Sequence, residues 1–330
     1  DVPSTGSTYT LKLPAVTANV VTTGDTQTIT SGMLSANGPT WDANSNLTVA
    51  GTVVTGSPMG FRNRVINGAF DIWQRGTSVA LVTASSQYRA DRWGGIYFQN
   101  GRHQRVSVSS PPTGLTAQYA CRVSSSTTAE VAGGTRMVCD QPIENLNCYD
   151  LVGQTVTLSF WIKFSAATLS SISNTGDSTY GNFYYNILNS TTTADSATWT
   201  TLYSSNISAS ITNGSLPTTW TKYTLTGTVP AGTTNLAVRF GMQSLGSTTV
   251  ADTNYFDVTQ VQLEVGTVAT PFERRSYGQE LALCQRYFLG ATFATGTTYS
   301  TTTINAQFFF PVEMRTGPSV SAYPSGTFTI

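Results

Sequence analysis

The sequence predicts an all-β fold: a jelly-roll β-sandwich with an N-terminal fibrous or shaft segment, a short connector helix and a C-terminal β domain. Thr and Ser fill 56 and 35 of the 330 positions, and charged residues make up only 10%, against about 25% in ordinary globular domains. Thr, Val, Tyr and Phe favour pleated strands, whereas Ser, Gly and Asn favour turns. Strand-sized runs bounded by such turn residues recur along the chain, and a single segment has a helical period.

Residues 1–60 form a nearly uncharged segment rich in Thr, Ser, Gly and Asn, which we interpret as a shaft or a linker. The segment contains three short β-like runs, Tyr9–Leu13, Thr26–Thr30 and Asn46–Ala50. Each run is too short to bury a core alone. Such segments become stable when several copies of a chain wrap together, or they stay disordered. The sequence leaves both alternatives open.

Residues 61–275 are denser in aromatic residues and contain alternating runs, which predicts the main jelly-roll domain. The clearest runs are Gln154–Phe164, Asn182–Leu188, Trp220–Leu225 and Asn235–Phe240. In the last run, Leu236, Val238 and Phe240 share one face of the strand, and Arg239 lies on the other. Several strands at this spacing, separated by Gly, Pro and Asn, are typical of a sandwich or jelly roll.

The segment 276–288 is the one helix that the sequence predicts. Leu281, Cys284 and Phe288 are spaced i, i+3 and i+7, and Leu, Ala, Gln and Arg are good helix formers. We expect a short connector. Residues 289–330 return to strand-like runs and end at Ile330 in what looks like a strand. We therefore expect the start of an incomplete C-terminal β domain, which further chain or neighbouring copies complete.

The charge balance argues against nucleic acid as a partner. The chain has 17 basic and 17 acidic residues, so its formal net charge is zero and lacks the basic excess that phosphate binding uses. Nine of the 14 Arg residues lie between Arg62 and Arg136, where we expect them to order loops by hydrogen bonding. No run of 18 apolar residues occurs, so we expect no membrane insertion.

Four cysteines are too few and too scattered for a disulfide framework. Cys121, Cys139, Cys148 and Cys284 form no CxxC pair, and the single His103 leaves too few soft ligands for a zinc site. We expect buried free thiols in a protein assembled in a reducing cytosol. A bridge between Cys139 and Cys148 stays open, because spacing alone does not fix disulfide geometry.

Three stretches are specific enough to compare with known families. They are "NRVINGAFDIWQRGTS" (Asn63–Ser78) with "YRADRW" (Tyr88–Trp93); "LVGQTVTLSFWIK" (Leu151–Lys163); and "VQLEVGTVATPFERRSYGQELALCQRYF" (Val261–Phe288) followed by "FFFPVEMRTGPSVS" (Phe308–Ser321). Together they resemble a recurrent module of bacteriophage tail or head fibres. The same order also resembles the jelly-roll carbohydrate-binding modules of xylanases and cellulases, which open with Asn-Gly-x-Phe-acid and carry a "TLSFW" strand.

The resemblance to carbohydrate-binding modules implies a structural calcium and no other cofactor. In those modules, an acidic residue of the opening motif and one near the closing strand help to hold the ion, and the matching positions here are Asp71 and Asp257. The match at Asp257 is loose, because "YFDVTQVQLE" places it four residues before Val261, farther than in those modules. Calcium takes about six to eight oxygen ligands. The alternative is that Asp71 accepts hydrogen bonds at a turn or strand edge.

The same resemblance implies a glycan site built from exposed aromatic rings, amides and Arg. The candidates are Tyr97, Gln104, Tyr184, Tyr185, Trp199 and Tyr203. Neighbouring residues of a strand point to opposite faces, so at most one of Tyr184 and Tyr185 faces a ligand while the other packs. Packing in the core or on a sheet is the competing interpretation of each aromatic residue. We expect Trp73, Trp93 and Trp161 in the core.

The function expected from the resemblance is that of a virion fibre protein that binds host surface glycan during adsorption. We expect a homotrimer, assembled in the bacterial cytoplasm and located in the virion, with other tail or capsid proteins and host polysaccharide as partners. The chain has one His and no GxSxG, P-loop, GxGxxG or HExxH motif, so we expect no enzyme. The alternatives are a glycan-binding module of a secreted bacterial protein, a tail-spike depolymerase, and a spacer that holds another adhesin.

Overall fold

The chain divides into two compact units, Asp1–Gly56 and Ser57–Ile330. In the first unit, β1 (Thr40–Trp41), β2 (Leu47–Val49) and β3 (Thr52–Val53) form a small antiparallel sheet in that order. The computed structural model describes residues 40–41, 47–49, 52–53, 61–80, 87–95, 101–125, 136–169, 182–191, 204–243, 253–290, 294–300 and 303–318.

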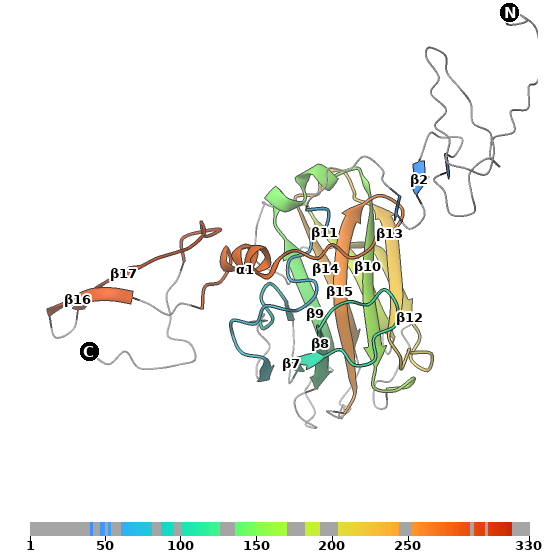
Figure 1. Ribbon diagram of the computed structural model, residues 1–330, viewed down its shortest axis with the longest axis horizontal. Coiled ribbons are helices and arrows are strands. Elements are labelled where there is room, and N and C mark those ends of the chain that lie inside the picture. Colours follow the sequence, from blue (N-terminus) through green and yellow to red (C-terminus); the bar gives the residue numbers. More distant parts are fainter. Residues whose placement is uncertain are drawn as a thin grey trace, which may run out of the picture. The chain divides into compact units, whose positions relative to one another are not determined.

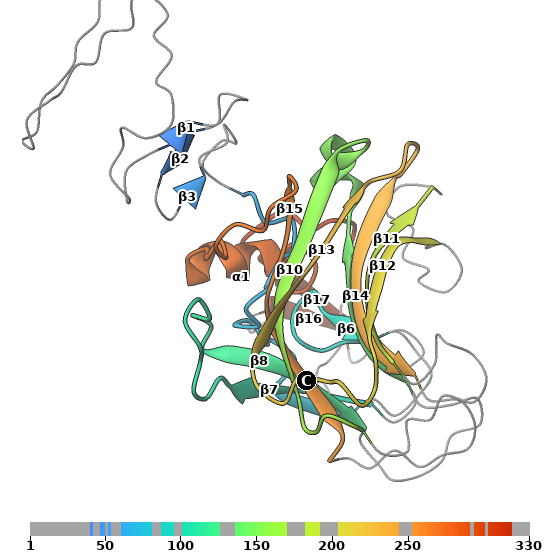
Figure 2. The same cartoon turned by 90° about the vertical axis from the view of Figure 1, so that its right-hand side faces the viewer.

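The second unit contains an antiparallel β-sandwich, which confirms the predicted all-β class. The β10 sheet has the strand order β13 (Thr221–Thr228), β10 (Thr155–Phe164), β15 (Tyr255–Val265), β8 (Tyr119–Ser125), β7 (Gly101–Ser107) and β4 (Ser78–Ala80). The β14 sheet has the order β12 (Ser204–Ile211), β11 (Phe183–Ser190), β14 (Asn235–Gln243), β9 (Arg136–Ile143), β6 (Gly94–Gly95) and β5 (Gln87–Tyr88). Figure 2 shows the two layers, with β10, β13 and β15 in one and β11, β12 and β14 in the other. Successive strands often change sheet, as in a jelly roll.

The four runs predicted as strands all lie in this sandwich. They correspond to β10, β11, β13 and β14. β10 is paired along both edges: Leu158 pairs with Leu225 of β13 on one side and with Leu263 of β15 on the other. The β10–β15 register shifts between Ser159 and Trp161. Such a bulge bends the strand and re-aims the side chains beside it.

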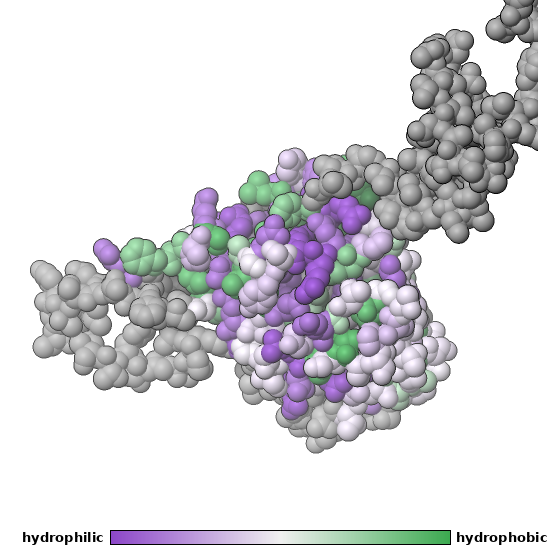
Figure 3. All heavy atoms as spheres, in the orientation of Figure 1, coloured by the Kyte–Doolittle hydropathy of each residue, from purple (hydrophilic) through white to green (hydrophobic). Residues whose placement is uncertain are grey.

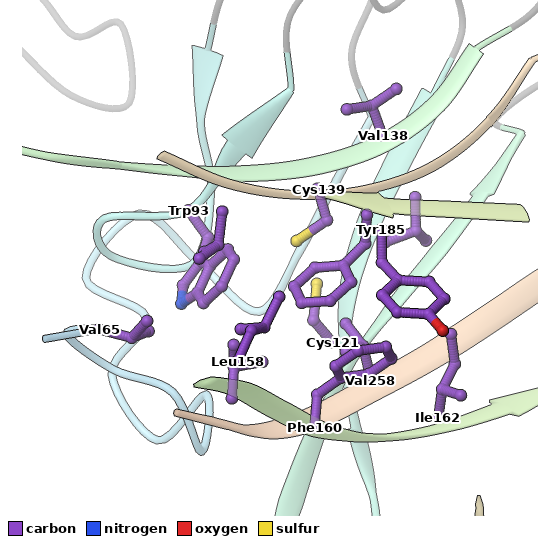
Figure 4. Close-up of a cluster of buried hydrophobic side chains, with 14 of the residues drawn as sticks. Val65, Trp93, Cys121, Val138, Cys139, Leu158, Phe160, Ile162, Tyr185 and Val258 are labelled. Carbon is purple, nitrogen blue, oxygen red and sulfur yellow. The ribbon is translucent and has the colours of Figure 1, made fainter. Parts of the chain in front are cut away.

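The core between the sheets is aromatic. Phe160 makes edge-on contacts with Tyr185 and Phe240, with ring centroids 5.1 and 4.7 Å apart. Figure 4 shows Phe160 and Tyr185 approaching from opposite layers. Edge-to-face pairs at this distance stabilise the fold by more than the burial of their apolar area alone. Trp73 and Trp93 lie in the same core, as predicted, whereas Trp161 is half-buried outside it.

Asparagine side chains fix the opening motif to the closing strand and to nearby backbone. Asn63 donates from Nδ2 to the carbonyl oxygen of Val261 at 3.0 Å, and its Oδ1 accepts from the backbone of Leu263 at 3.1 Å. Asn67 donates to the carbonyl oxygens of Ile72 and Asp91. These bonds satisfy buried backbone groups that an irregular segment would otherwise leave unpaired.

The predicted connector is α1 (Tyr277–Gln285), the helix beside the sandwich in Figure 1. Ser276 and Gln279 form a reciprocal capping box at its N-terminus, the arrangement that supplies the first orphan N–H groups with acceptors. Its buried Cys284 packs with Ile66 and Ile72 of the opening motif. In the described part of the chain, no helix has the length and apolar character needed to cross a membrane.

The remaining described strands are β16 (Ala294–Ser300) and β17 (Thr303–Phe308), which form a two-stranded antiparallel hairpin. They lie in the stretch 289–330 in which the sequence predicts a return to strands. Beyond them, Arg315 donates its backbone N–H to the carbonyl oxygen of Arg286, just after α1. The segment that follows the hairpin is therefore tied back to the end of the helix.

Candidate functional site

The outer face of the β14 sheet is built by the strand alternation that the sequence predicts. In β11, Tyr185 points into the core, where its ring contacts Phe160, and Tyr184 and Asn186 therefore project from the opposite face. Figure 4 shows the same alternation in β9, where Cys139 points inward and Val138 points away. The side chains considered next share this outer face.

Asn186, Arg239 and Asp140 form a row across three strands. The register pairs Asn186 of β11 with Arg239 of β14, and Arg239 with Asp140 of β9. Arg239 donates from Nε and Nη2 to the two carboxylate oxygens of Asp140 at 3.0 and 3.1 Å. The Asp140 side chain is fully buried, whereas that of Arg239 is 23% exposed. The pair therefore places an oriented guanidinium at the surface with its charge balanced.

Tyr184 lies in the next row, against a glycine. The register pairs Tyr184 with Gly241 of β14. A Cβ atom on Gly241 would come within 2.7 Å of the Tyr184 hydroxyl oxygen and 2.8 Å of Cζ. The phenol ring therefore rests directly on the backbone of β14, and a side chain at position 241 would lift it off. The result is a half-buried aromatic ring lying across the sheet.

Asn186 adds a hydrogen-bond acceptor between these two features. Its Oδ1 is buried and has no hydrogen-bond partner among the described residues. A buried acceptor without a donor costs roughly 1–3 kcal/mol. Because Asn186 neighbours Tyr184 along the outer face and Arg239 across it, a bound hydroxyl group could satisfy this oxygen. The face thus combines an aromatic surface, a fixed cation and an unmet acceptor.

The outer face of the β10 sheet carries a different row, which contains Gln104. The register aligns Lys163, Asp257, Arg122 and Gln104 on neighbouring strands. Arg122 donates from Nε and Nη2 to the carboxylate oxygens of Asp257 at 2.8 and 2.9 Å, and the Lys163 ammonium lies 3.8 Å away. The hydrogen bonds to Asp257 raise the pKa of Arg122. Hydrophilic side chains cross the centre of the face drawn in Figure 3.

This environment does not suit calcium at Asp257. The carboxylate is 1% exposed, and both of its oxygens are already bonded to Arg122, with a second cation nearby. A calcium ion would require oxygen ligands where the structure has two positive charges. Asp71, the other predicted ligand, is half-buried, and burial raises its pKa while Arg274 and Arg105 act in the opposite direction. Neither acid belongs to a group of three or more ligand side chains in the described residues.

The structure describes three of the six residues predicted to bind glycan, and it places them apart. Tyr184 lies on the outer face of the β14 sheet and Gln104 on that of the β10 sheet. Tyr185 is 6% exposed and contacts Phe160 in the core, so it is a packing residue out of reach of a ligand on either outer face. Tyr97, Trp199 and Tyr203 lie outside the described residues.

Four residues of the candidate face were missed by the sequence analysis as site residues: Asn186, Arg239, Asp140 and Gly241. The alternation of β14 does place Arg239 on the non-core face. Its partner Asp140, however, lies 99 residues away in sequence, and nothing in the local pattern links the two. Nothing in the sequence marks Gly241 as a site residue, because its role depends on the Tyr184 ring that packs on it in the structure.

No protein-family model matches the sequence, and no curated protein matches it. Among solved structures, the chain is similar to the enzymatically active domain of tailspike protein 4 of bacteriophage CBA120, with 16% identity over 62% of this chain and 22% of that chain, and a TM-score of 0.35. It is similar to a CBM4 carbohydrate-binding module, with 15% identity, coverage of 61% and 98%, and a TM-score of 0.32. It is also similar to a Stig cyclase from Fischerella, with 13% identity, coverage of 62% and 96%, and a TM-score of 0.31.

Proposed function

We propose that the protein is a non-enzymatic virion fibre component that binds a neutral host surface glycan through the outer face of the β14 sheet. The observation that carries the proposal is the Tyr184 ring resting on Gly241, beside the Arg239–Asp140 pair. An aromatic surface with a few directed polar groups is the general pattern of a small-molecule site. The attachment to a virion rests on the fibre-like motifs of the sequence.

The chemistry of the face favours a neutral sugar. The apolar side of a pyranose can lie on the Tyr184 ring, and its hydroxyl groups can donate to Asn186 Oδ1 and accept from Arg239. Because Asp140 balances the charge of Arg239, this pair adds no net positive charge that would attract an acidic ligand. One such site is expected to bind with millimolar to micromolar affinity, about −4 to −8 kcal/mol.

The proposed homotrimer would compensate for weak single sites. Three linked copies raise the apparent affinity by roughly 10² or more without any new contact. Light scattering of the full chain tests this part directly: a trimer is expected, and a stable monomer would contradict it. The trimer is independent of the glycan face, so either part of the proposal can fail alone.

The absence of turnover is also part of the proposal. Hydrolysis of a glycosidic bond ordinarily requires two carboxyl groups, one of which must donate a proton. On the proposed face the one acid in the row, Asp140, is fully buried and bonded to Arg239. A carboxylate held in this way is poorly placed to act as a general acid. Release of oligosaccharides from a bacterial polysaccharide would instead support the depolymerase.

The central experiment compares the wild type with Tyr184→Ala on a glycan array and in binding to host cells. We expect Tyr184→Ala to lose binding and Tyr184→Phe to keep most of it, because the ring surface is retained. Tyr149→Ala is the matched control, since Tyr149 is 62% exposed and lies in a 3-10 helix outside the strands of the β14 sheet. Circular dichroism must show that each variant is folded. If the wild type binds neither the glycan array nor host cells, the result would support the alternative of a spacer that holds another adhesin.

A further inference from the structure

A second cluster of functional side chains lies inside the sandwich, far from any outer face. It consists of His103 of β7, Cys121 of β8 and Cys139 of β9, and all three are fully buried. One ligand atom from each lies within 4.8 Å of the others. His103 and Cys121 belong to the β10 sheet and Cys139 to the β14 sheet. Figure 4 shows the Cys121 and Cys139 sulfur atoms facing one another between the layers.

We propose that His103, Cys121 and Cys139 bind one zinc ion that ties the two sheets of the sandwich together. Thiolate sulfur and imidazole nitrogen are the ligands that zinc prefers in proteins, and Cys₂His sets occur among its sites. The cluster uses the only histidine of the chain. Zinc usually has four ligands, so a main-chain oxygen or a water molecule would complete the three side chains.

One nitrogen of the His103 imidazole is tied to the main chain. Its Nε2 lies 2.9 Å from the carbonyl oxygen of Val138. When Nε2 carries the proton and donates to that carbonyl, Nδ1 carries the lone pair that a metal requires. Metal-binding histidines commonly fix their orientation by such a bond from the other ring nitrogen.

Charge balance explains why a divalent cation suits this place. Both sulfur atoms are fully buried in the apolar core, where a single thiolate would be an uncompensated charge. Zinc binding replaces the two thiol protons, which leave to solvent, and two new sulfur–zinc bonds form. Two thiolates and one Zn²⁺ sum to zero charge. A neutral centre avoids the large cost of an uncompensated ion in an apolar interior.

The position of the cluster gives the ion a structural role. Because its ligands come from both sheets, the ion would cross-link the layers at the β7–β8–β9 end, as an inter-sheet disulfide does in other sandwiches. Binding energy of this kind adds to folding stability, because the unfolded chain has no preformed site.

The first test is the zinc content of the full chain, produced in zinc-supplemented medium, desalted and measured by mass spectrometry of the metal. We expect about one zinc per chain, and loss of most of it in Cys121→Ala, Cys139→Ala and His103→Gln. Cys148→Ala and Cys284→Ala are the matched controls, since both residues are buried cysteines outside the cluster. They should keep the metal. Equal loss in controls and cluster variants would contradict the proposal.

A second test uses only the wild type, so it remains informative if the cluster variants do not fold. The wild type is unfolded in denaturant that contains a chelator and is then refolded with Co²⁺. Thiolate ligands of Co²⁺ give a sulfur-to-cobalt charge-transfer band. We expect that band, and a higher melting temperature after refolding with Zn²⁺ than without it. A metal-free protein with unchanged melting and no cobalt band would overturn the proposal. A Cys121–Cys139 disulfide found in the purified protein would overturn it as well.

Discussion

Arg239 of β14 and Asp140 of β9 form a two-point ion pair on the outer face of the sandwich, with N–O distances of 3.0 and 3.1 Å. The carboxylate is fully buried, whereas the guanidinium remains in partial contact with solvent. An acid in this position depends on its partner, because a buried charge without a counter-charge is costly. The pair therefore belongs both to the stability of the sheet and to the proposed glycan face.

The substitution Asp140→Ala should destabilise the protein by roughly 3 kcal/mol, because it leaves the Arg239 guanidinium partly buried without its partner. Urea unfolding monitored by circular dichroism measures the change. Asp150→Ala is the control: Asp150 pairs with Arg64 at 2.6 Å, but its side chain is 42% exposed. Removal of such a surface pair should cost less than about 1 kcal/mol. Similar costs for the two variants would show that Asp140 is not a structural acid.

Gly241→Ala should weaken glycan binding while the protein stays folded. The new Cβ atom would collide with the Tyr184 ring, 2.7 Å from its hydroxyl oxygen, and would also crowd the carbonyl oxygen of Met137 at 3.0 Å. The ring must then leave the sheet. We expect about a tenfold loss of affinity, or ~1.4 kcal/mol, by titration with a glycan that the array identifies. Unchanged affinity would remove the Tyr184 ring from the binding face.

Much of the fold could be predicted because its signals are local. The strand alternation placed Arg239 opposite the core residues of β14, and the helical spacing of Leu281, Cys284 and Phe288 marked the segment that forms α1. The pairing of Arg239 with Asp140 could not be predicted, because it depends on which distant strand neighbours β14.

The two tyrosines and the buried cysteines show the same limit. Alternation shows that Tyr184 and Tyr185 point to opposite faces of the strand. Which of the two lies in the core depends on which face of the sheet packs against the other sheet, and the sequence alone does not give this. The prediction of buried thiols is confirmed, and no disulfide joins Cys139 to Cys148. Counting soft ligands along the sequence missed the cluster with Cys121, because its members lie on strands of two different sheets.

Gly68→Ala should be among the most damaging small substitutions in the chain. A Cβ atom on Gly68 would collide with the carbonyl oxygen of Val261, which is backbone and cannot move aside. The same carbonyl accepts from Asn63, and Val261 donates back to the Gly68 carbonyl at 2.9 Å. We expect a loss of roughly 2–4 kcal/mol, measured by thermal and urea unfolding.

Its control is Gly278→Ala in α1, where a Cβ atom would meet nothing within 4 Å. Alanine is the better helix former, so this variant should gain up to about 1 kcal/mol. Equal behaviour of the two glycine variants would mean that the close approach of Gly68 to Val261 is absent in solution.

Trp161→Ala should destabilise the protein although Trp161 lies outside the main core. Its half-buried ring packs against a cluster formed by Leu115, Ala120 and Trp220 on the outer side of the β10 sheet. Loss of a partly buried indole should cost roughly 2 kcal/mol, less than the full truncation of a core Trp. Thr224→Ala, an exposed change on the neighbouring strand β13, should stay within about 0.5 kcal/mol. An unchanged melting temperature in Trp161→Ala would show that the ring is exposed and would make it a candidate ligand contact.

Tyr287 should make the protein sensitive to alkali. Burial raises its pKa to about 12 from the ordinary value of 10, although the Arg92 guanidinium, stacked 3.5 Å from the ring centre, acts in the opposite direction. The unfolded chain therefore releases this proton near pH 10 and the folded chain only near pH 12. Stability from this group is complete below pH 10 and falls as the pH rises to 12, by an amount on the order of 2 kcal/mol. Urea unfolding at a series of pH values measures it. Tyr287→Phe should flatten the fall, whereas Tyr149→Phe, which removes only an exposed hydroxyl, should leave it unchanged. A wild-type curve that runs parallel to that of Tyr287→Phe from pH 10 to 12 would contradict the prediction.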